Sequence, residues 1–252
     1  MYYLDGSKRS PSDALGHWID QETPNGIQHL RMMSGYFGLS GLGAFQDIIS
    51  ELNKSGQPIT TVLGANNKET VKVDLDDYLD LVLAPRSGVK TAIVSYANGL
   101  FHPKVYHLSR TDGSALAYLG SANLTDFGIN SGNIEAGILL DTRGSDDPGI
   151  LAQIAASIDC WFGTSNQAVN EINTHSDVNA LAKKGIIGIA ARPPQLNGGK
   201  SAGKTKKPSL RPVVNLGNKL RKKRKGASQP INPIPPQPPG TPGTGVAPAN
   251  TV

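Results

Sequence analysis

The sequence predicts an α/β sandwich around a mixed β-sheet, followed by a tail that stays disordered. Within residues 1–190, short β-branched runs alternate with amphipathic segments in the order strand, helix, strand. Hydrophobic residues make up 38% of the 252 residues, which is enough for a core in one large domain or two small ones. Beyond residue 190 large apolar residues become rare, so the predicted core ends there.

Four segments have the features of helices. Ser12 is a favourable N-terminal cap for the first, and the second has apolar residues at positions 42, 45, 48, 49 and 52, which share one helical face. Gly56 is a typical residue to end that second helix. We therefore expect helices over residues 13–20, 41–56, 73–85 and 147–165.

The segments between these helices read as strands because they are short, rich in β-branched and aromatic residues, and bounded by turn residues. A turn at residues 112–114, with the sequence Asp-Gly-Ser, joins two of them into a hairpin. The expected strands cover residues 29–37, 58–66, 90–98, 104–110, 115–122 and 133–142.

The charge is divided unevenly along the chain. Residues 200–225 hold 11 Lys and Arg and no acid, which leaves 14 basic beside 20 acidic residues in 1–199 and a net charge of −6 there. Residues 226–252 carry eight prolines and no charge, so they cannot bury enough surface to offset the entropy of ordering. The predicted organisation is a catalytic domain over 1–190, a basic linker over 191–225 and a disordered proline-rich tail over 226–252.

Several classes of protein are disfavoured. No run of 18 apolar residues exists and the N-terminus lacks a signal pattern, so we expect a cytoplasmic protein without stable membrane insertion. A lone cysteine, Cys160, excludes an internal disulfide and a cysteine-based zinc cluster. We interpret Cys160 as a buried small side chain beside Trp161 and Phe162. No Asp, Glu and His cluster has metal-ligand spacing, so neither a metal nor a cofactor is expected.

Residues 101–135 carry the chemistry. His102 and Lys104 are two apart, as are Ser121 and Asn123, so each pair shares a face of an extended segment. A neutral imidazole can attack phosphorus or carbon, while an ammonium, a hydroxyl and an amide can hold an anionic oxygen. Glu135, inside an expected strand, needs a partner, and the Nδ1 proton of a catalytic histidine would be one. Each motif alone is commonly a turn or a solvated surface, and only the ordered set favours catalysis.

This set resembles the phospholipase D superfamily, whose signature is HxK, then GSxN, then Asn-x-Glu. The matching residues are His102-Pro-Lys104, Gly120-Ser121-Ala-Asn123 and Asn133-Ile-Glu135, and segments 34–42 and 62–66 also look similar. The family Asp five residues after the lysine is Ser109 here, a loss common among nuclease-like members. HPKVY and GSANLT resemble the N-terminal nuclease domain of phospholipase D-type restriction endonucleases.

The resemblance implies a dimer and a two-step reaction. Members with one HxK pair form two-fold dimers with both histidines at the interface, and this chain has one pair. His102 of one subunit would attack phosphorus, and the partner subunit's His102 would protonate the leaving oxygen. Lys104, Ser121 and Asn123 would hold the phosphate, and Glu135 would orient His102. Tyr106 would pack beside the site, whereas core packing is expected for Tyr36 and Phe37.

The substrate is inferred from the basic residues near the end of the chain. A Lys and Arg block would neutralise phosphates without reading sequence, which favours DNA. A phospholipid substrate and a non-catalytic nucleic-acid-binding role remain the alternatives. The expected phosphate-binding residues of this block are Lys219, Arg221, Lys222, Lys223, Arg224 and Lys225.

Overall fold

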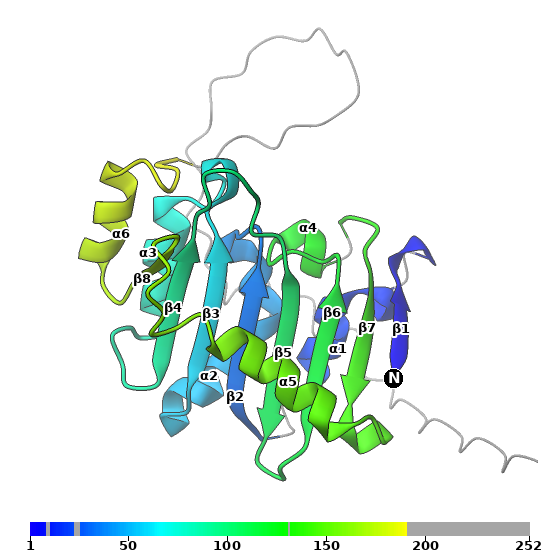
Figure 1. The fold of residues 1–252 in the computed structure, drawn as a ribbon. Helices are drawn as coiled ribbons and strands as arrows, with labels where there is room; N and C mark the ends of the chain where they lie inside the picture. Colours follow the sequence, from blue (N-terminus) through cyan, green and yellow to red (C-terminus); the bar gives the residue numbers. More distant parts are fainter. Residues whose placement is uncertain (9–10, 23–25, 131, 191–252) are drawn as a thin grey trace, which may run out of the picture. The chain divides into compact units, whose positions relative to one another are not determined.

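The computed structural model describes residues 1–190 except 9–10, 23–25 and 131. Its centre is a mixed eight-stranded sheet with the order β1-β7-β6-β5-β2-β3-β4-β8 (Figure 1). Strands β2, β3 and β4 are parallel, and the other neighbours are antiparallel. The strands are β1 (Tyr2–Asp5), β2 (Ile27–Ser34), β3 (Ile59–Gly64), β4 (Val89–Val94), β5 (Lys104–Arg110), β6 (Ala115–Gly120), β7 (Ala136–Asp141) and β8 (Val169–Glu171).

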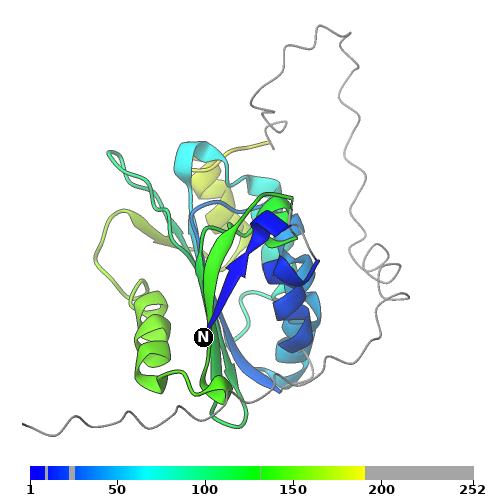
Figure 2. The same ribbon diagram turned by 90° about the vertical axis from the view of Figure 1, so that its right-hand side faces the viewer.

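Helices cover the two faces of the sheet unequally. Helix α5 lies alone on one side, and the remaining longer helices lie on the other (Figure 2). We call these sides the α5 face and the core face. The main apolar core fills the core face, and two small apolar clusters lie under α5. The helices are α1 (Leu15–Glu22), α2 (Gln46–Ser55), α3 (Lys72–Leu81), α4 (Asp126–Ile129), α5 (Pro148–Asp159) and α6 (His175–Lys183).

The expected α/β class and mixed sheet are confirmed, and each expected strand and helix is present, all but one of them with shifted ends. Strand β5 has the expected bounds. The helix expected over 41–56 is in two parts, a 3₁₀ segment (Leu39–Phe45) and then α2. Gly56 ends α2 with φ 68°, and its N–H donates to the carbonyls of Leu52 and Asn53. This is the left-handed ending that glycine adopts without strain.

Four elements were not foreseen, namely β1, β8, α4 and α6. Strand β8 has three residues and forms by pairing with the edge strand β4, so it leaves little pattern in the sequence. Helix α6 had a readable signal. Thr174 accepts from the Asp177 N–H while the Asp177 carboxylate accepts from the Thr174 N–H, which is a capping box.

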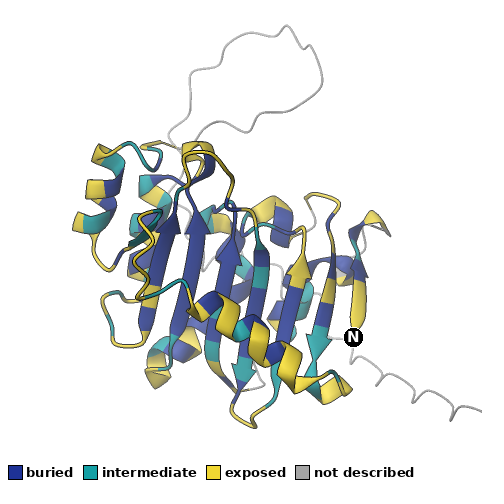
Figure 3. Ribbon diagram, in the orientation of Figure 1, coloured by how far each residue is buried: buried dark blue, intermediate teal, exposed yellow. Residues whose placement is uncertain are grey.

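Burial follows the layers. The central strands are buried along most of their length, whereas β1, the end of β6 and the start of β7 carry exposed residues (Figure 3). Arg110 is fully buried in β5, and it forms ion pairs with Glu22 at 2.7 Å and Asp141 at 2.9 Å. These pairs connect α1, β5 and β7. Cys160, expected to be buried, is exposed at the C-terminal end of α5, where its Sγ–H donates to the Ser157 carbonyl of the last turn.

Candidate active site

The signature residues converge at one edge of the sheet. Lys104 is the first residue of β5, Gly120 is the last of β6, and Glu135 directly precedes β7. Because these three neighbouring strands alternate in direction, the start of β5, the end of β6 and the start of β7 meet at the same edge. Residues more than 30 positions apart in the sequence therefore line one surface.

His102 and Lys104 are in direct contact. The Lys104 Nζ lies 2.8 Å from the His102 Nδ1 and 3.0 Å from the His102 carbonyl oxygen. The imidazole is exposed, while only 6% of Lys104 is accessible. Burial lowers the pKa of His102, and the neighbouring Lys104 lowers it further. Burial also lowers the pKa of Lys104, whereas the Glu135 carboxylate acts to raise it.

This contact fixes which ring nitrogen holds the proton. An ammonium can only donate, so the His102 Nδ1 accepts and the proton of the neutral ring is assigned to Nε2. In that form the Nε2–H of His102 can donate a hydrogen bond, but giving the proton away requires the imidazolium, which carries a second proton on Nδ1. To attack through Nε2, the ring must carry its proton on Nδ1, which requires Lys104 to move to another acceptor such as a phosphate oxygen.

The backbone before His102 is held by Gly35 and Asn66. A Cβ at Gly35 would lie 2.7 Å from the Phe101 carbonyl oxygen and 2.9 Å from the His102 Cα, so only glycine permits this approach. The buried Asn66 Nδ2 donates to the carbonyls of Gly35 at 2.8 Å and Phe101 at 2.6 Å. The Asn66 Oδ1 accepts from the Phe101 N–H at 3.0 Å. Sequence reasoning found the segments of both residues but not this positioning role.

Glu135 has a different partner from the one expected. Its carboxylate accepts a short hydrogen bond from the Ser121 hydroxyl and a second one, of 3.1 Å, from the Asn133 amide. The expected bond to His102 is wrong for a single chain, because β6 lies between the start of β5 and the start of β7. Glu135 also precedes β7 rather than lying within a strand. Glu135 is 9% exposed, and its charge acts on the site by raising the pKa of Lys104.

The Gly-Ser-Ala-Asn turn is held by hydroxyl groups from the core face. Tyr106 donates to the Ala122 carbonyl at 2.9 Å, and the Leu124 N–H donates to the Ser34 hydroxyl at 2.9 Å. The Ser121 hydroxyl accepts from the Ala136 N–H at 3.0 Å. The Oδ1 of Asn123 is buried without a hydrogen-bond partner among the described residues.

Tyr36 was expected in the core, and this expectation is wrong. Its ring is partly exposed and meets the His102 ring edge-on, with the centroids 5.5 Å apart and an angle of 84° between the ring planes. Phe37, the next residue, is 4% exposed and belongs to the main core as expected. Alternating directions in an extended segment separate the two rings, so neighbouring aromatic residues have different roles.

Other expected features lie elsewhere. The Lys and Arg block over 219–225 lies outside the described residues. Within the described part of the chain, no group of three or more His, Cys, Asp or Glu side chains is placed to hold a metal ion. No described helix is both long and apolar enough to cross a membrane.

A histidine–lysine pair beside a GSxN turn, on one edge of a mixed sheet with helices on both faces, defines a phospholipase D-like domain. The chain belongs to the family described as NgoFVII restriction endonuclease N-terminal PLD domain, whose model matches residues 17–161. The resemblance seen in the sequence is therefore confirmed. No curated protein matches the chain.

Three solved structures share low sequence identity with this chain and a similar fold. Phosphatidylserine synthase of Haemophilus influenzae is 16% identical, with a TM-score of 0.46, over 68% of this chain and 42% of that one. NucT from Helicobacter pylori is 17% identical, with a TM-score of 0.44, over 63% of this chain and 92% of that one. Nuc from Salmonella typhimurium, a phospholipase D family member, is 16% identical, with a TM-score of 0.42, over 62% and 90%. The chain thus spans under half of the synthase and most of the two smaller proteins.

Proposed function

We propose that this protein is a phosphodiesterase that cleaves DNA as an endonuclease through a phosphohistidine, without a metal ion. The observation that carries the proposal is the contact between His102 and Lys104 beside the Ser121–Asn123 turn at one sheet edge. The family match supports the nuclease class. A role in restriction or phage defence, in the cytoplasm, is the biological setting that fits this activity.

The reaction has two steps. In the first, Nε2 of His102 attacks phosphorus, a P–N bond forms, and the bond to the leaving oxygen breaks. The partner subunit's His102 gives its Nε2 proton to that oxygen. In the second step this same imidazole takes a proton from water, the hydroxide attacks phosphorus, and the P–N bond breaks to release the product. The proton donor of the first step is the imidazolium, so Lys104 of that subunit must also leave its Nδ1.

Charge stabilisation comes from side chains already at the edge. Lys104 leaves the His102 Nδ1 for a non-bridging oxygen, which both neutralises charge and frees His102 to act as the nucleophile. Asn123 adds an amide donor, and Ser121 hydrogen-bonds the phosphate or its neighbours. Glu135 acts through its bond to Ser121 and through its field on Lys104, in place of direct contact with His102 in the same chain.

A homodimer completes the site in this proposal, because each chain has one HxK pair. Exposed apolar residues surround the catalytic edge. Leu119 and Ile138, paired in register on β6 and β7, are 36% and 38% exposed, and Phe127 and Ile134 are 56% and 59% exposed. Apolar side chains grouped in this way favour contact with another protein surface. A two-fold contact here would bring both His102 side chains together.

DNA is the proposed substrate because a Lys and Arg block neutralises phosphates irrespective of base sequence. The test is cleavage of plasmid and single-stranded DNA in excess EDTA by wild type and by His102→Ala, with His17→Ala as a matched control on α1. We expect wild type and His17→Ala to cleave and His102→Ala to be inactive. Equal cleavage by all three would refute His102 as the nucleophile.

Two other outcomes decide between functions. Release of a head group from phospholipid vesicles, without DNA cleavage, would move the assignment to a phospholipase or transphosphatidylase. DNA binding without cleavage of any phosphodiester would assign a non-catalytic role. Acid-labile phosphate on His102, detected by mass spectrometry after a rapid quench, would support the covalent step.

A further inference from the structure

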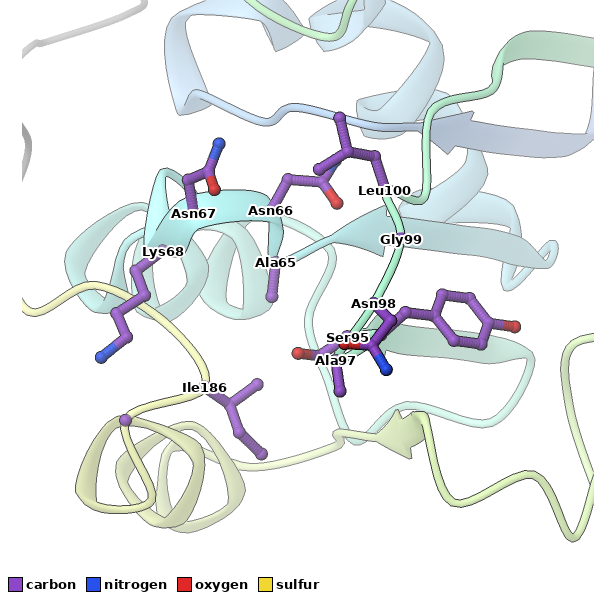
Figure 4. Close-up of a pocket in the computed structure, with 12 residues that line it drawn as sticks. Ala65, Asn66, Asn67, Lys68, Ser95, Ala97, Asn98, Gly99, Leu100 and Ile186 are labelled. Atoms are coloured by element: carbon purple, nitrogen blue, oxygen red, sulfur yellow. The ribbon is translucent and has the colours of Figure 1, made fainter.

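A cavity of about 470 Å³ lies beside the catalytic edge. It is formed by the segments that follow β3 and β4 and by the turn after α6. Lys68 and Ile186 lie on one side of it, and Ser95, Ala97 and Asn98 lie on the other (Figure 4). The carboxyl ends of parallel strands are where open α/β sheets commonly bind ligands. The volume is in the range of about 300–1,000 Å³ that is typical of small-molecule sites.

The cavity is continuous with the catalytic segment. Leu100, which lines it, stands two residues before His102, and two extended residues span at most about 7 Å. Asn66 lines the same cavity and also fixes the Phe101 backbone through a donated and an accepted hydrogen bond. A ligand in the cavity would therefore be about one nucleotide from a phosphate at His102.

The lining has a polar composition that suits a nucleotide. Lys68 is exposed and forms no ion pair with any carboxylate among the described residues. The Asn98 amide can both donate to and accept from a base edge. Tyr96 also belongs to the lining, but its hydroxyl accepts from the Asn166 amide at 3.2 Å, outside the cavity, so its ring is not counted as a stacking surface. An acyl chain would find few apolar partners here.

The backbone under this lining is unusual. Asn67 and Lys68 have φ values of 51° and 59°, so two consecutive residues with side chains are left-handed. Such conformations cost about 1–3 kcal/mol each and collect at functional sites. They turn the Lys68 side chain toward Gly185, where a Cβ would be 3.4 Å from the Lys68 Nζ. The strain thus keeps an ammonium beside the cavity.

We propose that this cavity is a subsite for one unpaired nucleotide of the substrate strand, next to the phosphate that is cleaved. The Asn98 amide contacts the edge of the base, and Lys68 neutralises the neighbouring phosphate. The inference rests on the proposed function, because it assumes a polynucleotide at His102. A base in this cavity has left the helical stack, so the protein binds single-stranded or locally unpaired DNA more tightly than duplex.

The test measures binding and catalysis separately. Full-length His102→Ala protein is titrated onto a fluorescein-labelled ten-nucleotide thymidine strand and onto a duplex of the same length. In this background Asn98→Ala should weaken single-strand binding about fivefold, because it removes a hydrogen bond to the base. Lys68→Gln should weaken it about fivefold and reduce the salt slope by about one unit. Lys54→Gln, which removes an ammonium on α2 away from the cavity, should change neither quantity. Circular dichroism confirms that each variant is folded.

Unchanged single-strand affinity in both cavity variants would overturn the subsite. Equal affinity of the His102→Ala protein for single strand and duplex would overturn the proposed preference for unpaired DNA. Hydrolysis of bis(p-nitrophenyl) phosphate by wild type tests the catalytic edge alone, since this substrate carries no nucleotide. If wild type hydrolyses it and the cavity variants bind normally, the subsite fails and the function stands. If wild type is inactive on every phosphodiester and Asn98→Ala still loses single-strand binding, the subsite is supported and the proposed function is refuted.

Discussion

The two faces of the sheet are stabilised in different ways. On the core face, strand residues such as Leu30, Met32 and Tyr106 are fully buried in one continuous apolar cluster. On the α5 face, the same strands β2 and β5 present Arg31 and His107, which are paired in register. The comparison shows that the core face is held mainly by apolar burial, with buried ion pairs at Arg110, whereas the α5 face combines small apolar clusters with a polar half that depends on which groups are charged.

The polar half of the α5 face is a connected set. Arg31 forms an ion pair with Asp159 of α5 at 3.0 Å and also donates to Ser109 at 3.3 Å. His29 lies 2.9 Å from the Thr60 hydroxyl. Burial, with help from Arg31, lowers the pKa of both His29 and His107 to about 4. Both imidazoles are therefore neutral at neutral pH, and the single ion pair fixes the end of α5.

The largest effect should come from the core face. Phe45 is fully buried between the 3₁₀ segment and the sheet, and its ring lies 5.6 Å from that of Tyr106. Phe45→Ala should lower the free energy of unfolding by about 3–5 kcal/mol, because it removes apolar contacts and leaves a cavity. Urea denaturation measures the change, and it should be nearly the same near pH 7 and near pH 5. A strong pH dependence of this loss would contradict the division between the faces.

The α5 face should give the chain its acid sensitivity. The folded pKa of His107, about 4, is below its unfolded value of 6.5, so the unfolded state binds more protons between these values. Stability is complete above pH 6.5 and falls as the pH drops toward 4, by about 2–3 kcal/mol for this one group.

The matched variant is His107→Gln, which is polar and does not titrate. The difference in unfolding free energy between about pH 7 and about pH 4.5 should shrink by about 2 kcal/mol in this variant. Urea denaturation at both pH values measures it. The same pH difference in wild type and variant would show that His107 is not protonated on unfolding.

A smaller effect is expected from the ion pair. Asp159→Asn removes the charge that faces Arg31, whose side chain is 13% exposed while that of Asp159 is 43% exposed. Because the pair is partly screened by solvent, the loss should be about 1–2 kcal/mol. Asp147→Asn, at the other end of α5, keeps an N-terminal cap and serves as the control with a smaller change. Equal losses would mean that the ion pair contributes little to holding α5.

The smallest effect tests backbone geometry. Gly56 ends α2 at φ 68° with open space around a Cβ, so Gly56→Ala introduces only the left-handed penalty of about 1 kcal/mol. Gly144, near the start of α5, also has open space but no positive φ. Gly144→Ala should be neutral or slightly stabilising. Thermal denaturation of both variants decides this, and equal changes in Tm would contradict the geometric explanation.

Much of the fold was visible in the sequence for local reasons. Strand β5 was placed at its true ends because a β-branched and aromatic run meets a turn at 112–114. Gly56 marked the end of α2 because the left-handed backbone conformation that ends a helix is favoured by glycine itself and does not depend on distant contacts. The order of His102, Lys104, Ser121 and Asn123 indicated the family, since four specific residue types at fixed spacings can be read directly from the sequence.

What only the tertiary structure decided depends on contacts between distant segments. The partner of Glu135 is Ser121 because β6 separates β5 from β7, and strand order is not written in either motif. The packing of Tyr36 against His102, the two bonds of Asn66 and the cavity beside them also require three segments to meet. A sequence specifies residue types and local backbone preferences, whereas side-chain partners depend on the order in which the strands pair and on how the segments pack together.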